Sequence, residues 1–108
     1  MTEPSPSPAE EFSAALLSNA ARFGVELSAG HAARLRAYYE QTVKWNTRLH
    51  LVAPCTPAEF AVRHVLESLL AVPFLSRGAR LIDVGSGAGL PAVPCLVARP
   101  DLRATLFE

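Results

Sequence analysis

The sequence predicts an α/β protein in which a helical region, residues 8–78, precedes a short β-α-β unit, residues 79–108. Two observations give this class. Apolar residues first recur at the three- and four-residue spacing of amphipathic helices, and after residue 79 they gather in two runs of strand length. A glycine-rich loop and a predicted helix connect these runs, and a right-handed crossover of this kind makes the two strands parallel neighbours.

The composition limits the class of protein further. The chain has 108 residues, half of them hydrophobic, and its ten basic and ten acidic side chains cancel. Without a net field, contact with nucleic acid depends on a local patch. Cys55 and Cys95 are isolated, so we expect free thiols in a reducing cytoplasm and no metal site. We expect no membrane association, because residues 1–11 lack a signal-peptide pattern and no apolar run is long enough to span a bilayer.

Residues 1–7 alternate proline and serine, and this composition predicts a disordered lead-in. Ser7 begins a capping-box pattern and Pro8 suits the first helical position, so a first helix is predicted from there to Gly24. Glycine at that position is a typical helix stop.

Two more helices are predicted before residue 79. Ser28 can cap the second, which we expect to end near Trp45–Asn46. Thr56 and Glu59 form a second capping box, and apolar residues at helical spacing extend the third helix to about Leu70. Tyr38, Tyr39 and Trp45 have the spacing of core residues, which favours the core over base stacking.

The glycine-rich loop follows a predicted strand, Leu81–Val84, whose continuous apolar run indicates burial on both faces. Gly85, Gly87 and Gly89 allow φ > 0 and let a ligand approach a main chain without Cβ atoms. A helix from Leu90 to about Arg99 then leads to a second strand. That helix opens with Pro91 and Pro94 in its first turn, and the strand spans Ala104 to Glu108.

The spacing of the glycines indicates which class of ligand the loop can bind. A dinucleotide fingerprint requires G-x-G-x-x-G, but Leu90 stands where its third glycine belongs, so a nicotinamide-dependent oxidoreductase fits poorly. Glu108 ends the second strand 19 residues beyond Gly89. A carboxylate there can accept hydrogen bonds from vicinal ribose hydroxyls. A glycine turn without a ligand is the plain structural alternative.

The D-x-G-x-G-x-G pattern that starts at Asp83 resembles motif I of S-adenosylmethionine-dependent methyltransferases. With the segments upstream, the chain resembles the bacterial small-subunit ribosomal RNA guanine-N7 methyltransferase family, also known as glucose-inhibited division protein B. It departs from the family pattern at His50–Val52, Glu67 and Ala92, where the family usually has N-L-T, Asp and Gly. The matching segments are Trp45–Asn46 with Leu49 and Leu51, Arg63–Leu69, Asp83–Pro91 with Pro94, and Arg99–Asp101.

The resemblance implies a Rossmann-like methyltransferase sheet, of which this chain holds the beginning, and methyl transfer from S-adenosylmethionine to a guanine N7 of 16S rRNA. The implied partner is the small ribosomal subunit, and the implied protein is monomeric. It implies no catalytic side chain, and we expect this 108-residue part to be inactive by itself. The cofactor-binding residues that it implies are Asp83, Gly85, Ser86, Gly87, Gly89, Leu90 and Glu108.

Arg63 and His64 have two interpretations of equal weight. The resemblance places them at the edge of the active-site crevice, where they help to hold RNA or cofactor. Alternatively, His64 is a hydrogen-bonded interior histidine and Arg63 pairs with Glu59 or Glu67 on its own helix. The competing classes for the whole chain are the nicotinamide-type oxidoreductase and a non-enzymatic helical RNA-binding module.

Overall fold

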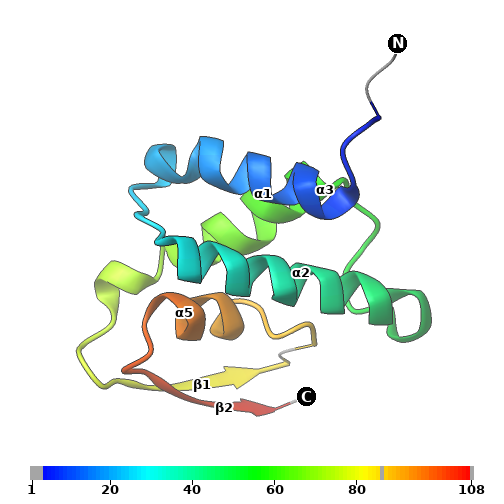
Figure 1. Cartoon of the computed structure of the whole chain (residues 1–108). Coiled ribbons are helices and arrows are strands. Elements are labelled where there is room, and N and C mark those ends of the chain that lie inside the picture. The colour runs from blue at the N-terminus through cyan, green and yellow to red at the C-terminus, as the bar shows by residue number, and fades with distance from the viewer. Residues whose placement is uncertain (1–3, 86, 108) are drawn as a thin grey trace.

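A computed structural model describes residues 4–85 and 87–107. Figure 1 shows helices α1 and α2 with the third helical segment behind them, and α5 between α2 and a two-stranded sheet. Pro4–Ser7 of the predicted lead-in has no regular structure and is exposed. The elements are α1 (Pro8–Asn19), η1 (Ala20–Phe23), α2 (Ala29–Leu49), α3 (Pro57–Glu59), η2 (Phe60–Leu66), α4 (Glu67–Leu69), η3 (Val72–Phe74), β1 (Arg80–Val84), α5 (Ala92–Ala98) and β2 (Arg103–Phe107).

The three predicted helix starts are confirmed by their caps. The hydroxyl of Ser7 accepts a hydrogen bond from the Glu10 amide at 3.2 Å, and that of Ser28 from the His31 amide at 3.0 Å. Thr56 forms both halves of its capping box with Glu59, at 3.0 and 3.1 Å. Each bond satisfies an amide that the first helical turn leaves free, so these starts depend on local sequence alone.

The predicted end of α2 near Trp45–Asn46 is wrong, because the helix continues to Leu49. His50 ends it in the left-handed conformation, with φ of 49°. Asn46 stays helical, and its side-chain oxygen accepts a hydrogen bond from the Val52 amide at 2.9 Å. The asparagine therefore organises the segment after the helix instead of terminating it.

The third helical segment begins and ends close to its prediction but is not uniformly α-helical. Its middle, η2, is a π-helix of seven residues between the short α-helical turns α3 and α4. A π-helix adds a residue per turn, and the apolar spacing of the sequence does not reveal it.

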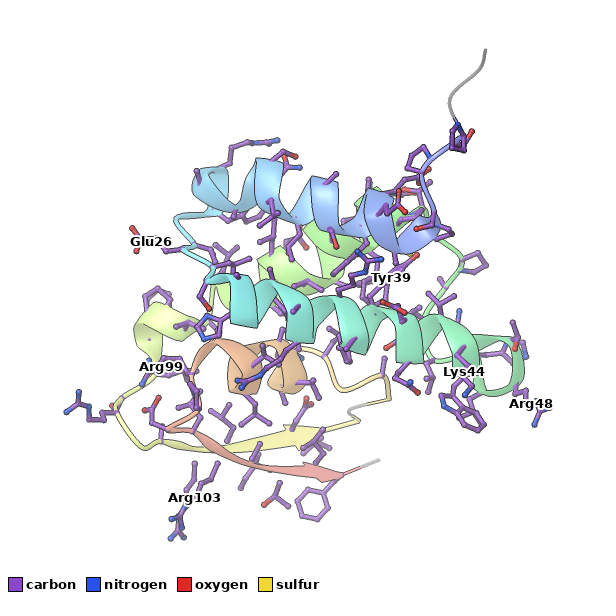
Figure 2. All side chains as sticks on the ribbon, in the orientation of Figure 1. Glu26, Tyr39, Lys44, Arg48, Arg99 and Arg103 are labelled. Carbon is purple, nitrogen blue, oxygen red and sulfur yellow. The ribbon has the colours of Figure 1, made fainter. Side chains whose placement is uncertain are left out.

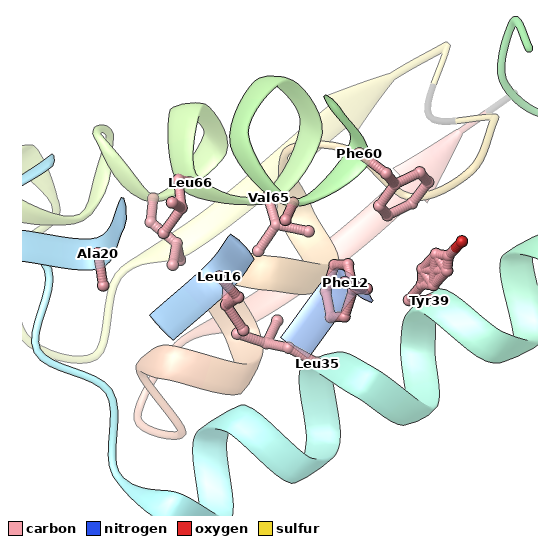
Figure 3. Packing of buried hydrophobic residues seen from close by; sticks show 10 residues of the cluster. Phe12, Leu16, Ala20, Leu35, Tyr39, Phe60, Val65 and Leu66 are labelled. Atoms are coloured by element: carbon pink, nitrogen blue, oxygen red, sulfur yellow. The ribbon is translucent and has the colours of Figure 1, made fainter. Parts of the chain in front are cut away.

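The hydrophobic core lies between α1, α2 and η2 (Figure 3). The rings of Phe12 and Tyr39 stack with centroids 4.5 Å apart, and Phe60 meets Tyr39 edge-on at 5.1 Å. Pairs of this kind add about 0.5–1.5 kcal/mol each to the area that they bury. Leu16, Leu35 and Val65 belong to the same core and are fully buried. The aromatic and aliphatic side chains together determine how the three helices pack.

The two strands pair in parallel, as predicted, from Arg80 opposite Arg103 to Val84 opposite Phe107. The predicted burial of β1 on both faces is wrong. Ile82 and Val84 are 73% and 77% exposed, because α5 covers one face of the sheet and no described residue covers the other. Within the described residues, no helix combines the length and the apolar character needed to cross a bilayer.

An ion pair fixes the loops that precede the strands. Arg99 donates two hydrogen bonds of 2.8 Å to the carboxylate of Asp101, which also accepts a 2.8 Å bond from the Gly78 amide. These bonds hold the pKa of Asp101 well below its usual range. The segment before β1 is thereby joined to the segment before β2.

Candidate functional site

The glycine loop leaves β1 at the carboxyl end of the strand. Gly85, Gly87 and Gly89 all have positive φ, at 72°, 49° and 84°. The conformation that the sequence required of these positions is confirmed, because other residues adopt it only at a cost. The Gly85 amide donates to the carbonyl of Phe107 at 2.6 Å, so the start of the loop is held against the end of β2.

The three glycines differ in what surrounds them. A Cβ atom on Gly85 would meet no heavy atom of the described residues within 4 Å, and one on Gly87 would lie 4.0 Å from the Leu51 carbonyl oxygen. A Cβ on Gly89 would lie 2.6 Å from a methyl group of Val93 on α5. Gly85 and Gly87 therefore leave the main chain open to a ligand, whereas Gly89 is required by packing.

Asp83 is the penultimate residue of β1 and shares the covered face of the sheet with Leu81. Its Oδ2 atom is buried and has no hydrogen-bond partner among the described residues. A buried acceptor without a partner costs about 1–3 kcal/mol, which a hydrogen-bond donor from a ligand recovers. Asp83 also lines a cavity of about 250 Å³ together with Pro91 and Ala92 at the start of α5.

Tyr38 packs partly buried against the core, as its helical spacing predicts, and it also contacts the glycine loop, which the sequence does not predict. Its hydroxyl, on α2, donates a hydrogen bond of 2.6 Å to the carbonyl oxygen of Ala88, between the second and third glycines. Burial raises the pKa of Tyr38 to about 12, so the hydroxyl keeps its proton and remains a donor at neutral pH. Helical spacing places Tyr38 on the inward side of α2 but gives no signal for a partner 50 residues away.

The other predicted site residues are placed as follows. Leu90 is half-buried at the end of the loop, whereas Ser86 and Glu108 lie outside the described residues. Arg63 is exposed and pairs with Glu59 at 3.5 Å, one of the two pairings that its local alternative predicts. His64 meets the ring of Phe60 edge-on at 5.2 Å. Their role at the crevice edge stays a prediction.

Both cysteines are free, as expected. Cys95 is buried on α5, its thiol lies 3.5 Å from the Ser68 carbonyl oxygen, and burial raises its pKa. Cys55 is exposed and lines a cavity of about 520 Å³ between Pro8, α2, residues 50–57 and Phe60. The described residues that line this larger cavity include none of the cofactor-binding residues predicted from the sequence.

Comparison with known proteins gives a consistent result. The family model described as "GidB: rRNA small subunit methyltransferase G" matches residues 31–108. Proteins named "Ribosomal RNA small subunit methyltransferase G" match most of this chain. The one from Anaeromyxobacter dehalogenans (strain 2CP-1) is 40% identical over 97 residues, which are 90% of this chain and 45% of that protein. The one from Desulfotalea psychrophila is 44% identical over 86 residues, 79% of this chain and 40% of that protein.

A third relative with the same name, from Ectopseudomonas mendocina, is 42% identical over 94 residues, 86% of this chain and 44% of that protein. This chain thus spans less than half the length of these relatives. The family model covers Tyr38, the complete glycine loop and both strands. The chain belongs to the GidB family of small-subunit rRNA methyltransferases.

Proposed function

We propose that this chain carries the S-adenosylmethionine-binding part of a Rossmann-like enzyme that methylates a guanine N7 in 16S rRNA. The observation that carries the proposal is the buried, unpartnered Oδ2 of Asp83 beside a loop of three left-handed glycines. The site also suits the chemistry of the cofactor, which offers a positively charged amino group, a ribose and a sulfonium centre. The small ribosomal subunit in the cytoplasm is the partner that follows from this activity.

Each group of the cofactor has a candidate residue. The carboxylate of Asp83 suits the amino group of the methionine portion, because a charge-assisted hydrogen bond satisfies its buried oxygen. The main chain at Gly85 and Gly87 is open and takes the close approach of the ligand. Glu108 is proposed to accept hydrogen bonds from the ribose hydroxyls, and Ser86 and Leu90 to line the loop.

The proposed reaction needs little from catalytic side chains. The bound cofactor supplies an activated methyl group on a sulfonium. Guanine N7 carries a lone pair and no proton, so the protein needs no general base, and its task is to align the two reactants and exclude competing geometries. Tyr38 contributes by holding the Ala88 carbonyl and with it the middle of the loop. Arg63 and His64 are proposed to border the RNA side of the crevice.

Calorimetric titration with S-adenosylmethionine, S-adenosylhomocysteine and NAD tests the proposal, on this chain and on a longer protein that contains it. We expect both adenosyl compounds to bind and NAD not to bind. Asp83→Asn keeps the shape of the side chain but removes its charge, so affinity for the adenosyl compounds should fall at least tenfold. Glu67→Gln is the matched control, because Glu67 is an exposed carboxylate on α4.

Binding of NAD in preference to S-adenosylhomocysteine would favour the oxidoreductase class. Equal affinity of the Asp83→Asn and wild-type proteins for S-adenosylhomocysteine would remove Asp83 from the site.

A further inference from the structure

The last turns of α2 carry an exposed group of side chains that the proposed function does not yet use. Trp45 is 43% exposed and Leu49 is 61% exposed, which overturns the core position predicted for the tryptophan. Lys44 and Arg48 belong to the same last turns of α2 and are labelled in Figure 2. We call Lys44, Trp45, Arg48 and Leu49 the α2 terminal surface.

The apolar part of this surface, Trp45 and Leu49, lies on the stripe of α2 from which Tyr38 contacts the glycine loop. Lys44 and Arg48 border that stripe toward the solvent side. In a helix with 3.6 residues per turn, positions 38, 45 and 49 share one stripe, because seven and eleven residues are close to two and three turns. Tyr38 reaches the carbonyl of Ala88 from this stripe, and Trp45 follows it about 10 Å further along the helix axis. Leu51, just beyond the helix, has its carbonyl oxygen 4.0 Å from where a Cβ on Gly87 would stand.

The charges of the surface are not neutralised locally. No Asp or Glu occurs between Glu40 and Glu59. Glu40 pairs with Arg36 at 3.2 Å, and Glu59 is bound by the Thr56 amide and by Arg63. The described residues give Lys44 and Arg48 no carboxylate partner, so these cations are available to an external anion. Lys44 already lies over the Trp45 ring, with its ammonium 5.7 Å from the centroid.

An aromatic face flanked by two unpaired cations has a definite chemical preference. A single-stranded nucleic acid offers bases that stack on the indole and phosphates that the cations neutralise. A double helix hides its base faces, and an acidic peptide supplies carboxylates but no nucleobase to stack on the indole.

We propose that the α2 terminal surface holds single-stranded RNA, with a base next to the target guanine stacked on Trp45 and the backbone phosphates on Lys44 and Arg48. The inference rests on the proposed function, since it assigns a contact surface to the proposed RNA substrate. Because the α2 terminal surface lies near the glycine loop, a base stacked on Trp45 would place the adjacent target guanine at the methyl-transfer site. The RNA strand then runs along the stripe of α2 that Tyr38 begins.

Trp45 is the sole tryptophan of the chain, so its fluorescence reports on this surface alone. We expect a single-stranded RNA of about ten nucleotides to quench the emission, while the same RNA annealed to its complement does not. Binding is measured independently by the anisotropy of end-labelled RNA. Trp45→Ala should weaken it about 5- to 150-fold, and Trp45→Phe, which keeps an aromatic face, should retain most of it.

The cations are tested through the dependence of RNA affinity on salt. Lys44→Gln and Arg48→Gln should each reduce the slope of log affinity against log salt by about 0.7, the value for one phosphate contact with a single strand. Arg103→Gln is the matched control, since this exposed arginine lies at the opposite end of the molecule in Figure 2 and should leave the slope unchanged.

Several outcomes overturn the inference. RNA binding without quenching, or with equal affinity in Trp45→Ala, places the RNA elsewhere and leaves the proposed function intact. A tryptophan emission that changes on dilution without RNA shows that a second copy of the chain covers the surface. If the wild-type protein binds S-adenosylhomocysteine but no RNA, the RNA-binding role of the α2 terminal surface is also wrong. If the wild-type protein does not bind S-adenosylhomocysteine at all, the proposed function itself is wrong.

Discussion

Replacement of Gly89 by alanine should destabilise the protein more than the same change at the other loop glycines. The new Cβ would stand 2.6 Å from the Cγ2 atom of Val93, a distance that real Cβ contacts do not show. Forcing such a contact costs about 1–3 kcal/mol. The backbone at φ of 84° adds about 1–2 kcal/mol for a residue with a side chain. We therefore expect Gly89→Ala to lower the free energy of unfolding by about 2–5 kcal/mol.

Gly85→Ala separates these two causes. Its φ of 72° is similar, but a Cβ there meets no described heavy atom within 4 Å. Its expected cost is the backbone part alone, about 1–2 kcal/mol. Val93→Ala in the Gly89→Ala background removes the clashing methyl groups, so the two substitutions together should be less harmful than the sum of their separate effects.

Urea unfolding followed by circular dichroism measures the wild-type protein, the three single variants and the double variant, with the unfolding slope as a check that the native state stays compact. Among the single variants we expect the largest loss in Gly89→Ala, and adding Val93→Ala should cost less than Val93→Ala costs in the wild-type protein. Equal losses in Gly89→Ala and Gly85→Ala, or strictly additive effects of the Gly89 and Val93 changes, would refute the packing role assigned to Gly89.

Three further predictions follow from the loop and its supports. Gly87→Val should abolish S-adenosylhomocysteine binding while the circular dichroism spectrum stays native, because a branched side chain fills the open approach and disfavours the φ of 49°. The raised pKa of Tyr38, about 12, predicts stability that is constant below pH 10 and falls as the pH rises toward 12; Tyr38→Phe should lose less stability in that range and should bind S-adenosylhomocysteine about 2- to 10-fold more weakly. The lowered pKa of Asp101 predicts stability that is present above about pH 4 and lost below it, so the wild-type protein and Asp101→Asn should differ at neutral pH and converge in acid unfolding experiments.

Where the sequence predicted structure correctly, the cause lies within a few residues. Ser7, Ser28 and Thr56 start helices because each hydroxyl accepts an amide three residues ahead. The end of α2 was mispredicted because Asn46 bonds to Val52, six residues away and outside the helix. The helix stop therefore depends on the path of the following segment, which local propensity does not determine.

In the glycine loop, too, local sequence predicts the backbone conformation but not the tertiary contacts. The sequence correctly required positive φ at Gly85, Gly87 and Gly89, but it assigned one purpose, access for a ligand, to all three. The structure gives Gly89 a different one, since Val93 occupies the space where its Cβ would stand. The spacing of glycines predicts backbone conformation, whereas the reason for each glycine depends on what tertiary packing brings against it.

Exposure was the least predictable property. The apolar pattern of β1 indicated burial on both faces, yet Ile82 and Val84 alternate outward from the single face that α5 covers. Trp45 has core spacing on α2 but is exposed and is not part of the core cluster. In both cases the hydrophobic pattern shows which side chains favour burial, and only the arrangement of neighbouring elements decides whether something covers them.

The helical region supports the glycine loop and is not a separate module in the described structure. Tyr38 of α2 binds the Ala88 carbonyl, and the Leu51 carbonyl lies next to Gly87. The Cys95 thiol contacts the Ser68 carbonyl and so joins α5 to the end of the third helical segment. A loop of small residues has little packing of its own, and glycine gains the most freedom on unfolding, so its conformation must be held from outside. α2 and the segment after it contact the loop, and α4 contacts α5, so the helical region and the β-α-β unit pack against each other, which disfavours an independent helical RNA-binding module.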